Sequence, residues 1–305
     1  MSEISAHIPE RIGFGIACAL FGMFGMAMMD SCAKLLSTGY AISQIVLARN
    51  AISGLAVPVG LDGSSLARLR FHRLDLIVLK TVTNLGAGFL FFTGLRYLPL
   101  ADAFAITFAA PLLITALSVP YLGEHFVMRR WIAVIIGFTG VMIVIQPGTA
   151  SFRLEALFPL GAALSYAMAM LIGRKMTREM STSAIMFWPS VGAVLITLAM
   201  MPSQWQTPPL PDFGLFIFMG LIGTLGMALI TQGYRYAPAA VIAPFDYSVL
   251  IWGAILGWMI WHEVPDANIW IGSAPVAASG LYTVHRETKA KTPLRHSSGP
   301  LKPTS

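Results

Sequence analysis

Charged side chains are scarce in this sequence. Asp, Glu, Lys and Arg make up 11% of its 305 residues and hydrophobic residues 56%, whereas a soluble domain carries roughly 25% charged residues. The mean hydropathy is +0.72. A chain with so few charges cannot cover its surface with groups that water solvates. The composition therefore excludes an ordinary soluble domain and predicts a protein embedded in lipid.

Cysteine and the common catalytic motifs are equally sparse. The two cysteines, Cys18 and Cys32, lie 14 residues apart on one predicted helix, which is about 21 Å at the helical rise and beyond disulfide reach. The sequence has no G-x-x-x-x-G-K-[ST] phosphate loop, no H-E-x-x-H motif and no Cys/His cluster. It therefore predicts neither an ATP-driven pump nor an enzyme, and no metal or other cofactor.

Long hydrophobic runs occupy most of the chain. A helix needs about 20 apolar residues to cross the hydrocarbon core. The first run continues from Ile12 far beyond the roughly 7–15 apolar residues of a cleaved signal peptide. We therefore predict an all-α integral membrane protein with ten transmembrane helices, over residues 12–35, 42–61, 75–95, 102–122, 131–147, 157–173, 183–201, 213–233, 240–261 and 269–284.

The positive charges fall mainly on one side of these predicted spans. A net charge of +6 is compatible with nucleic-acid binding, but the distribution of the charges favours a membrane. With the N-terminus in the cytoplasm, sixteen Lys and Arg residues lie inside and three lie outside. Cytoplasmic loops carry such an excess. The sequence therefore predicts that both termini are cytoplasmic, with the lipid bilayer rather than nucleic acid as the partner.

One stretch of the chain occurs twice. Residues 94–132 and 233–271 align without a gap at an offset of 139 residues, with nine identical positions. Both have a G-x-R-Y-x-P lead-in, a long apolar run, a Glu at its end (Glu124 and Glu263) and a Trp that opens the next run. An apolar composition does not by chance align Gly, Arg, Pro, Glu and Trp, so we infer an internal duplication.

The duplication and the topology together predict the domain organisation. The copies lie five spans apart, and this odd separation gives them opposite orientations across the bilayer. We therefore predict a five-plus-five inverted repeat, the architecture of carriers that work by alternating access. The predicted units are a cytoplasmic N-terminal tail over 1–11, repeats over 12–147 and 157–285, and a disordered cytoplasmic C-terminal tail over 286–305.

Three charged residues, Asp30, Lys34 and Arg49, lie near the outer ends of the first two spans. Ionisable side chains at membrane depth usually face the bundle interior or a water-filled cavity. The four-residue spacing of Asp30 and Lys34 allows a pair within one helix, and Arg49 lies at a similar depth. Two interpretations stay open: a structural pair of Asp30 with Arg49 or with Lys34, or direct contact with a substrate.

Asp246 is the strongest candidate for binding a substrate or a coupled proton. It lies about 9 Å inside the ninth span at the helical rise, and the duplication aligns it with Thr107. Tyr247 follows it, and the preceding Pro244 permits a kink. The alternative is a carboxyl group hydrogen-bonded to a neighbouring helix. Asp102 opens the fourth span and is expected to be an N-cap.

Five further polar or aromatic side chains within the spans are candidates for lining a cavity. Trp and Tyr commonly belong to the interfacial belt, so anchoring or packing is the alternative for each. An aromatic-lined cavity would suit a planar ring by stacking. The five residues are Asn84, Tyr166, Trp188, Gln232 and Trp252.

These patterns resemble the drug/metabolite transporter superfamily in its EamA-type branch, over residues 12–285. In the first copy the resemblance is carried by P-L-A-D-A at 99–103, L-G-E at 122–124, and Trp131 with Gly137 and Gly140. The second copy repeats part of it as R-Y-x-P-A-A at 235–240 and W-H-E at 261–263, and departs at Pro244 and Asp246.

The resemblance implies a secondary carrier of small metabolites in a bacterial inner membrane. The segments look similar to those of carriers for riboflavin or S-adenosylmethionine, and amino acids are a further substrate class. The family pattern fixes no substrate residues, so the candidates above rest on physical arguments. A passive channel or facilitator is the alternative. A membrane-embedded enzyme or assembly factor is disfavoured because no catalytic constellation is present.

Overall fold

The computed structural model describes residues 11–59, 73–123, 128–149, 152–177, 179–180, 182–201 and 205–290. All regular secondary structure in these residues is helical, and no β-strand occurs among them. The predicted all-α class is therefore confirmed. One boundary differs: the last helix continues to Ala290, into the segment predicted as disordered, because Arg, Glu and Lys favour a helix beyond the apolar run.

The helices follow one another with short connections. In the first copy they are α1 (Ile12–Leu36), α2 (Ile42–Val59), α4 (Leu74–Tyr97), α5 (Leu100–Thr107), α6 (Ala109–Leu122) and α7 (Met128–Ile145). A 3₁₀ turn, η1 (Leu154–Ala156), opens the second copy. There the helices are α8 (Leu157–Met176), α9 (Thr182–Met200), α10 (Leu210–Tyr236), α11 (Ala239–Asp246), α12 (Ser248–Trp261) and α13 (Ala267–Ala290).

Many of these segments are suited to a lipid environment. Within the described residues, six helical segments are long and apolar enough to cross a membrane, and two shorter apolar helices lie over Trp131–Ile145 and Phe187–Met200. The protein is therefore a multi-pass membrane protein. The six segments are Ile12–Leu36, Leu74–Tyr97, Leu100–Leu122, Leu154–Met176, Leu210–Tyr236 and Val241–Trp261.

Two of the predicted spans are not continuous helices. The fourth consists of α5 and α6, which meet at Phe108, and the ninth of α11 and α12, which meet at Tyr247. Phe108 and Tyr247 are 139 residues apart and are therefore counterparts in the duplication. The prediction of single helices over 102–122 and 240–261 is corrected at these two points.

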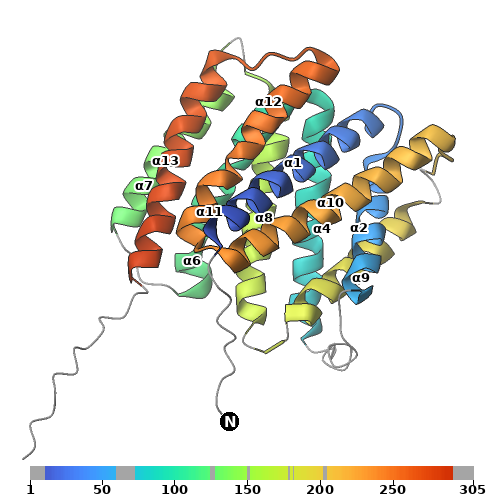
Figure 1. Ribbon diagram of the computed structural model, residues 1–305, viewed down its shortest axis with the longest axis horizontal. Coiled ribbons are helices and arrows are strands. Elements are labelled where there is room, and N and C mark those ends of the chain that lie inside the picture. The colour runs from blue at the N-terminus through green and yellow to red at the C-terminus, as the bar shows by residue number, and fades with distance from the viewer. Residues whose placement is uncertain are drawn as a thin grey trace, which may run out of the picture.

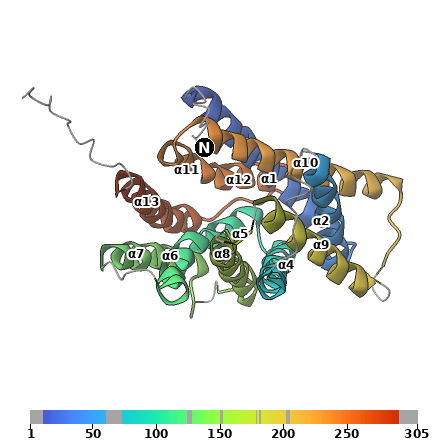
Figure 2. The same ribbon diagram turned by 90° about the horizontal axis from the view of Figure 1, so that it is seen from below.

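The helices form two layers (Figures 1 and 2). One layer contains α1 with α10, α11, α12 and α13, and the other contains α8 with α4, α5, α6 and α7, while α2 and α9 pack at one edge. By the 139-residue offset, each helix of one layer has its counterpart in the other. Each layer thus takes one helix from one copy and the rest from the other.

The contacts between helices repeat in the same way. α1 packs along α10 (Figure 1), and α8, the counterpart of α1, packs along α4, the counterpart of α10. The pairs α2 with α9 and α7 with α13 each consist of two counterparts. The described helices therefore show a pseudo-two-fold relation in their packing as well as in their sequence.

Glycine allows the close approach of α1 and α10. A Cβ added at Gly226 would lie 2.9 Å from the carbonyl oxygen of Gly22 and 3.1 Å from the backbone nitrogen of Met26. Small residues let membrane helices approach closely enough for van der Waals contacts to hold them together. Gly214, on the same helix α10, has nothing within 4 Å of such a Cβ.

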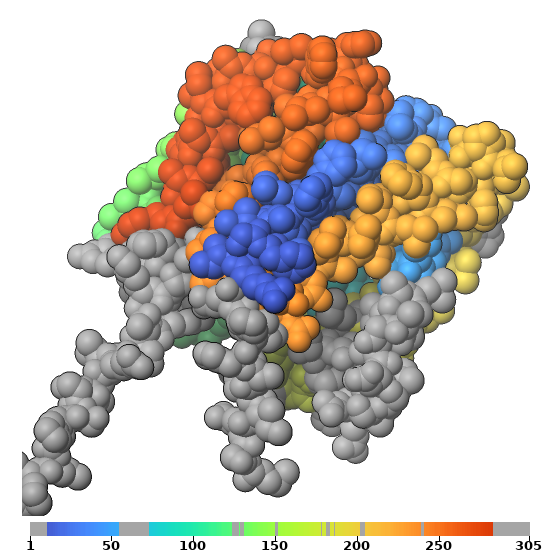
Figure 3. Space-filling view, in the orientation of Figure 1, coloured from blue at the N-terminus to red at the C-terminus, as the bar shows by residue number. Residues whose placement is uncertain are grey.

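The outer face of one layer is strongly apolar. Figure 3 shows α1 lying between α10 and α12 on this face, with α13 beside α12. Phe21 on α1 is 67% exposed, Leu221 on α10 is 56% exposed and Trp258 on α12 is 59% exposed. Soluble proteins rarely expose apolar patches of more than a few hundred Å². Lipid tails, by contrast, solvate such a surface.

We expect Gly226→Ala to destabilise the protein, because its methyl group meets backbone atoms of α1 that cannot rotate away. Overpacking of this kind costs about 1–3 kcal/mol, so the Tm in detergent should fall. Gly214→Ala is the matched control: Ala favours a helix by about 1 kcal/mol over Gly, and its Tm should be unchanged or higher. Equal Tm values for the two variants would contradict this account of the contact.

Candidate functional site

The two helix breaks lie against each other. The rings of Phe108 and Tyr247 have centroids 4.6 Å apart and are tilted by 39°. Their backbones are also similar, with φ and ψ of −64° and −3° at Phe108 and of −70° and −12° at Tyr247. The two residues are counterparts on different layers. Equivalent positions of the two copies therefore contact each other where the layers meet.

Proline lies next to both breaks. Pro111 has no N–H to bond the carbonyl group of Thr107, and the helix is interrupted at Phe108. In the second copy, Pro244 precedes the break within α11 and cannot bond the carbonyl group of Ala240. In a membrane protein, backbone groups freed in this way are tolerated where they are buried in protein or line a cavity.

Asp246 ends α11 directly before the second break. Its Oδ2 accepts a hydrogen bond of 2.6 Å from the hydroxyl group of Tyr234 on α10. Its Oδ1 is buried and has no hydrogen-bond partner in the part of the chain that the structure describes. A buried acceptor without a partner is costly. Oδ1 can therefore accept a hydrogen bond from a donor that the described residues do not supply.

Two more buried polar atoms without a hydrogen-bond partner among the described residues lie on α12. They are Oγ of Ser248 and Nε1 of Trp252. Being four residues apart, the two side chains share one face of the helix. The Trp252 ring meets Phe24 of α1 edge to face, with centroids 5.1 Å apart. The break region thus offers a carboxylate acceptor, a hydroxyl group and an N–H donor.

Tyrosines surround the carboxyl group of Asp246. Tyr166 on α8 and Tyr247 both interact with it electrostatically. Tyr166 is 46% exposed. The Tyr247 hydroxyl group lies against α13 at Gly280, where a Cβ would collide with it. Residues from both layers therefore contribute to one polar and aromatic site.

A second polar group joins the two layers. Lys34 on α1 is bonded to Oε1 of Glu263 at 2.5 Å and donates a hydrogen bond of 2.9 Å to the carbonyl oxygen of Leu98. Its Nζ also lies 4.7 Å from the ring centroid of Trp261. The expected alternative of an Asp30–Lys34 pair is therefore wrong. Helical spacing permits that pair, but tertiary packing brings Glu263 to the ammonium group instead.

Glu263 also caps α5 in the opposite layer. Its Oε2 accepts the backbone N–H of Leu100 at 3.2 Å, one of the N–H groups that a helix leaves unpaired in its first turn. Pro99 is the N-cap residue and Asp102 lies inside the first turn, so the predicted N-cap role of Asp102 is wrong. We call the bonds from Lys34 and Glu263 to the connection between α4 and α5 the interlayer tie.

The geometry of the tie depends on a left-handed residue. His262 has φ of 57° and turns the chain back at the end of α12. Its counterpart is Gly123, with φ of 69°, so both copies use the same turn before the repeated Glu. Glu124, the counterpart of Glu263, lies outside the described residues. Gly173 stands at the position equivalent to Lys34, and Nζ of Lys80 would lie 2.9 Å from a Cβ added there.

Asp30 and Arg49 lie near this tie. Asp30 is 5% exposed and interacts electrostatically with Arg49, although the ion pairs within 4 Å among the described residues do not include these two. The guanidinium group of Arg49 lies 5.6 Å from the ring centroid of Phe92. The arrangement favours the electrostatic partnership of Asp30 with Arg49 over one with Lys34.

The other candidate residues are more widely distributed. Thr107 adjoins the first break, but its hydroxyl group donates to the carbonyl oxygen of Ala103 one turn earlier, at 2.7 Å. Trp188 packs at the junction of α4, α8 and α9. Asn84 on α4 and Gln232 on α10 are exposed.

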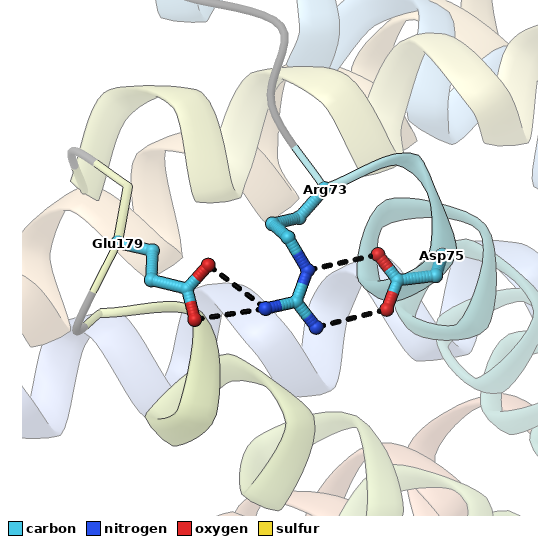
Figure 4. Close-up of polar contacts among 3 residues, drawn as sticks. All are labelled: Arg73, Asp75 and Glu179. Atoms are coloured by element: carbon cyan, nitrogen blue, oxygen red, sulfur yellow. Dashed lines mark hydrogen bonds and ion pairs between the residues drawn. The ribbon is translucent and has the colours of Figure 1, made fainter.

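Two further contacts between the copies are related by the duplication. Tyr40 donates a hydrogen bond of 2.5 Å to Asp212 at the start of α10. Arg73, before α4, donates hydrogen bonds of 2.9 Å to both carboxylate oxygens of Glu179 and is also held by Asp75 (Figure 4). Tyr40 and Glu179 are counterparts, and so are Arg73 and Asp212. We call Tyr40–Asp212 and Arg73–Glu179 the two clamps.

Each clamp holds helices of a single layer. The first joins the end of α1 to α10, and the second joins the end of α8 to α4. The hydrogen bond to Asp212 raises the pKa of Tyr40 to about 12. The hydrogen bonds to Asp75 and Glu179 raise the pKa of Arg73. Both donors therefore keep their protons at physiological pH.

Sequence reasoning did not find Tyr234 or the clamps. Tyr234 stands at the position equivalent to Leu95. A hydroxyl group in place of an apolar side chain could have marked Tyr234 as a candidate site residue. No such indication pointed to the clamps. Tyr40 and Glu179 occupy equivalent positions, but one side chain is a phenol and the other a carboxylate. Their relation becomes visible only through their partners.

The arrangement defines a class of protein: a multi-pass helical membrane protein with a polar, aromatic site between two related layers. The sequence matches the EamA-like transporter family twice, over residues 13–146 and 153–284. The chain therefore belongs to this family, and it is a transporter of small metabolites rather than an enzyme. The resemblance inferred from the repeated motifs is confirmed.

Curated relatives are named as transporters. The chain is 29% identical to an S-adenosylmethionine uptake transporter of Rickettsia bellii over 197 residues, which cover 65% of this chain and 68% of the relative. It is 29% identical to a riboflavin transporter of Vibrio cholerae over 192 residues, which cover 63% of this chain and 64% of the relative. A pseudopaline exporter of Pseudomonas aeruginosa is 25% identical over 264 residues, covering 85% of this chain and 92% of the relative.

A solved crystal structure of another protein shares the fold. Its TM-score is 0.54 at 18% sequence identity, and the match covers 90% of this chain and 99% of the other. At this identity the likeness concerns the fold alone.

We expect Glu263→Gln to lower the unfolding free energy by about 3 kcal/mol, because it leaves a buried ammonium group without its counter-charge. Adding Lys34→Met removes that charge and should restore most of the loss. Thermal unfolding in detergent measures both effects. Glu155→Gln, a carboxylate outside the tie, is the control and should leave the Tm unchanged. A double variant no more stable than Glu263→Gln would contradict the ion-pair role.

Proposed function

We propose that this protein is a secondary carrier that moves a small metabolite across a bacterial inner membrane by alternating access. In this proposal, ten helical segments cross the bilayer, the copies over 12–147 and 157–285 have opposite orientations, and both termini are cytoplasmic. The sixteen-to-three distribution of Lys and Arg supports the orientation. The bacterial relatives support the location.

One observation carries the proposal: the two broken helices meet as counterparts at Phe108 and Tyr247. In carriers built from inverted repeats, discontinuous helices form the substrate site where the repeats meet, near the midplane. The contact between the breaks therefore supports a substrate site formed by the residues around Phe108 and Tyr247. We propose that the residues lining it are Phe108, Tyr166, Tyr234, Asp246, Tyr247, Ser248 and Trp252.

The two layers are the proposed moving bodies. Glycine packing and one clamp hold α1 to α10, and the second clamp holds α8 to α4, so each layer can move as a unit. The interlayer tie joins the layers at Leu98 and Leu100, at the end predicted to face outward. With the tie formed and Tyr166 exposed, the conformation corresponds to a carrier closed outside and open to the cytoplasm.

The relatives narrow the substrate to small molecules that contain a ring. Those named for S-adenosylmethionine and for riboflavin both handle a planar heteroaromatic system. The tilted ring pair of Phe108 and Tyr247 supports such a substrate, because aromatic rings favour offset or tilted contacts. We therefore propose a heteroaromatic metabolite, with stacking at the helix breaks.

Counterflow in proteoliposomes tests the carrier proposal. We expect that unlabelled substrate trapped inside accelerates the entry of labelled S-adenosylmethionine or riboflavin, and that the flux saturates. A carrier exchanges one bound molecule for another, whereas a passive channel gives neither saturation nor counterflow. Liposomes with the Gly214→Ala protein, whose added methyl group meets nothing within 4 Å, should give the same flux, and empty liposomes set the background. Linear flux without counterflow would replace the carrier by the channel.

Labelling from each side of the membrane tests the interlayer tie. A cysteine at Tyr166, in a Cys18→Ala/Cys32→Ala background, should react with an impermeant maleimide faster from the cytoplasmic side. Glu263→Gln breaks the tie and should raise labelling from the outside by about tenfold, the equivalent of 1.4 kcal/mol. Tyr40→Phe removes a bond within one layer and should leave the ratio of the two rates unchanged.

Two outcomes would overturn this assignment of the tie. One is an unchanged ratio of outside to inside labelling in Glu263→Gln. The other is an equal change in Tyr40→Phe, which would indicate general loosening rather than the opening of one end.

A further inference from the structure

Asp246 differs from the other two acids described above, Asp30 and Glu263. Asp30 interacts with the guanidinium group of Arg49, and Glu263 is bonded to the ammonium group of Lys34. Among the described residues, no Lys, Arg or His side chain acts on Asp246 in this way. A carboxylate in a low-dielectric site requires a counter-charge or a proton. The protein supplies the counter-charge at the first two acids and does not supply it at the third.

The groups that face Asp246 are suited to a cation. They are the phenol side chains of Tyr166, Tyr234 and Tyr247, which come from α8, from α10 and from the break itself. The faces of aromatic rings carry negative charge density and attract cations. A carboxylate with an unpartnered oxygen and no cationic side chain of the described residues acting on it is itself complementary to a positively charged group and repels an anionic one.

We infer that the Asp246 site binds the positively charged group of the transported molecule, a sulfonium or an N-alkylated heteroaromatic cation. This inference rests on the proposed carrier function and adds the charge of its substrate. Oδ1 of Asp246 is free to face the cation, since its other oxygen is held by Tyr234. The ring pair of Phe108 and Tyr247 then lies beside the heteroaromatic part.

The remaining unpartnered atoms fit a substrate with further polar groups. Ser248 Oγ can donate or accept a hydrogen bond, and Trp252 Nε1 can donate one. Both lie on the helix that follows the break, on the same face. The site thus combines one negative charge, a stacking surface and two neutral hydrogen-bonding groups. A neutral ring alone would leave the carboxylate without a counter-charge.

Matched pairs of probes that differ in charge test the inference. S-adenosylmethionine carries a sulfonium group, whereas S-adenosylhomocysteine has an uncharged thioether in its place and keeps the same adenosine and amino acid groups. 1-Methylnicotinamide and nicotinamide form a second pair without adenosine. Equilibrium binding to the purified full-length protein is measured by the quenching of tryptophan fluorescence. We expect the cation of at least one pair to bind at least tenfold more tightly than its neutral partner.

Asp246→Asn keeps the shape of the side chain and removes its charge. We expect it to abolish the preference for the cation within a pair, so that both partners bind with similar affinity. Glu155→Gln removes a carboxylate outside the site and should retain the preference. The unfolding temperature of each variant shows whether it is folded.

The outcomes separate this inference from the carrier proposal. Equal binding within both pairs, binding of neither cation, or a preference that survives Asp246→Asn would overturn the cation site. If riboflavin then still shows counterflow, the carrier proposal stands without it. If the cations bind with the expected preference but no substrate shows counterflow, the site stands and the carrier proposal falls.

Discussion

The architecture depends on how closely α1 can approach α10. Gly226 leaves no space for a side chain against Gly22, and in lipid such contacts replace the hydrophobic effect as the force between helices. Because α1 belongs to the first copy and α10 to the second, this contact places α1 in the layer formed by helices of the second copy. The equivalent contact joins α8 to α4. Two mixed layers result, and the interface between them contains both helix breaks.

The polar groups act at different levels of this architecture. Each clamp lies within one layer, whereas the interlayer tie from Lys34 and Glu263 crosses from one layer to the other. The Asp246 site lies between the layers, where Phe108 meets Tyr247. The clamps and the tie therefore lie in different places, although both include an ion pair. Variants of each kind should have separable effects on stability and on access.

Three departures from the symmetry concern polar groups of the candidate site and of the tie. Asp246 replaces Thr107, and Tyr234 replaces Leu95, so the carboxyl group and its hydrogen-bond donor both occur in the second copy alone. Likewise Lys34 corresponds to Gly173. A symmetric scaffold gives the two ends of a carrier similar energies. Unpaired substitutions can then make the ends differ and provide one substrate site rather than two.

The sequence by itself determined the helical class, the duplication and the family, because hydrophobic run length and aligned residues are local properties of the chain. It also made Asp246 and Tyr247 candidates for the site, since their departure from the first copy is readable in the alignment. Only the tertiary structure decided that Glu263 rather than Asp30 pairs with Lys34, that Glu263 caps α5 in place of Asp102, and that Phe108 meets Tyr247. These contacts join residues far apart in the chain, and no local pattern determines which helices become neighbours.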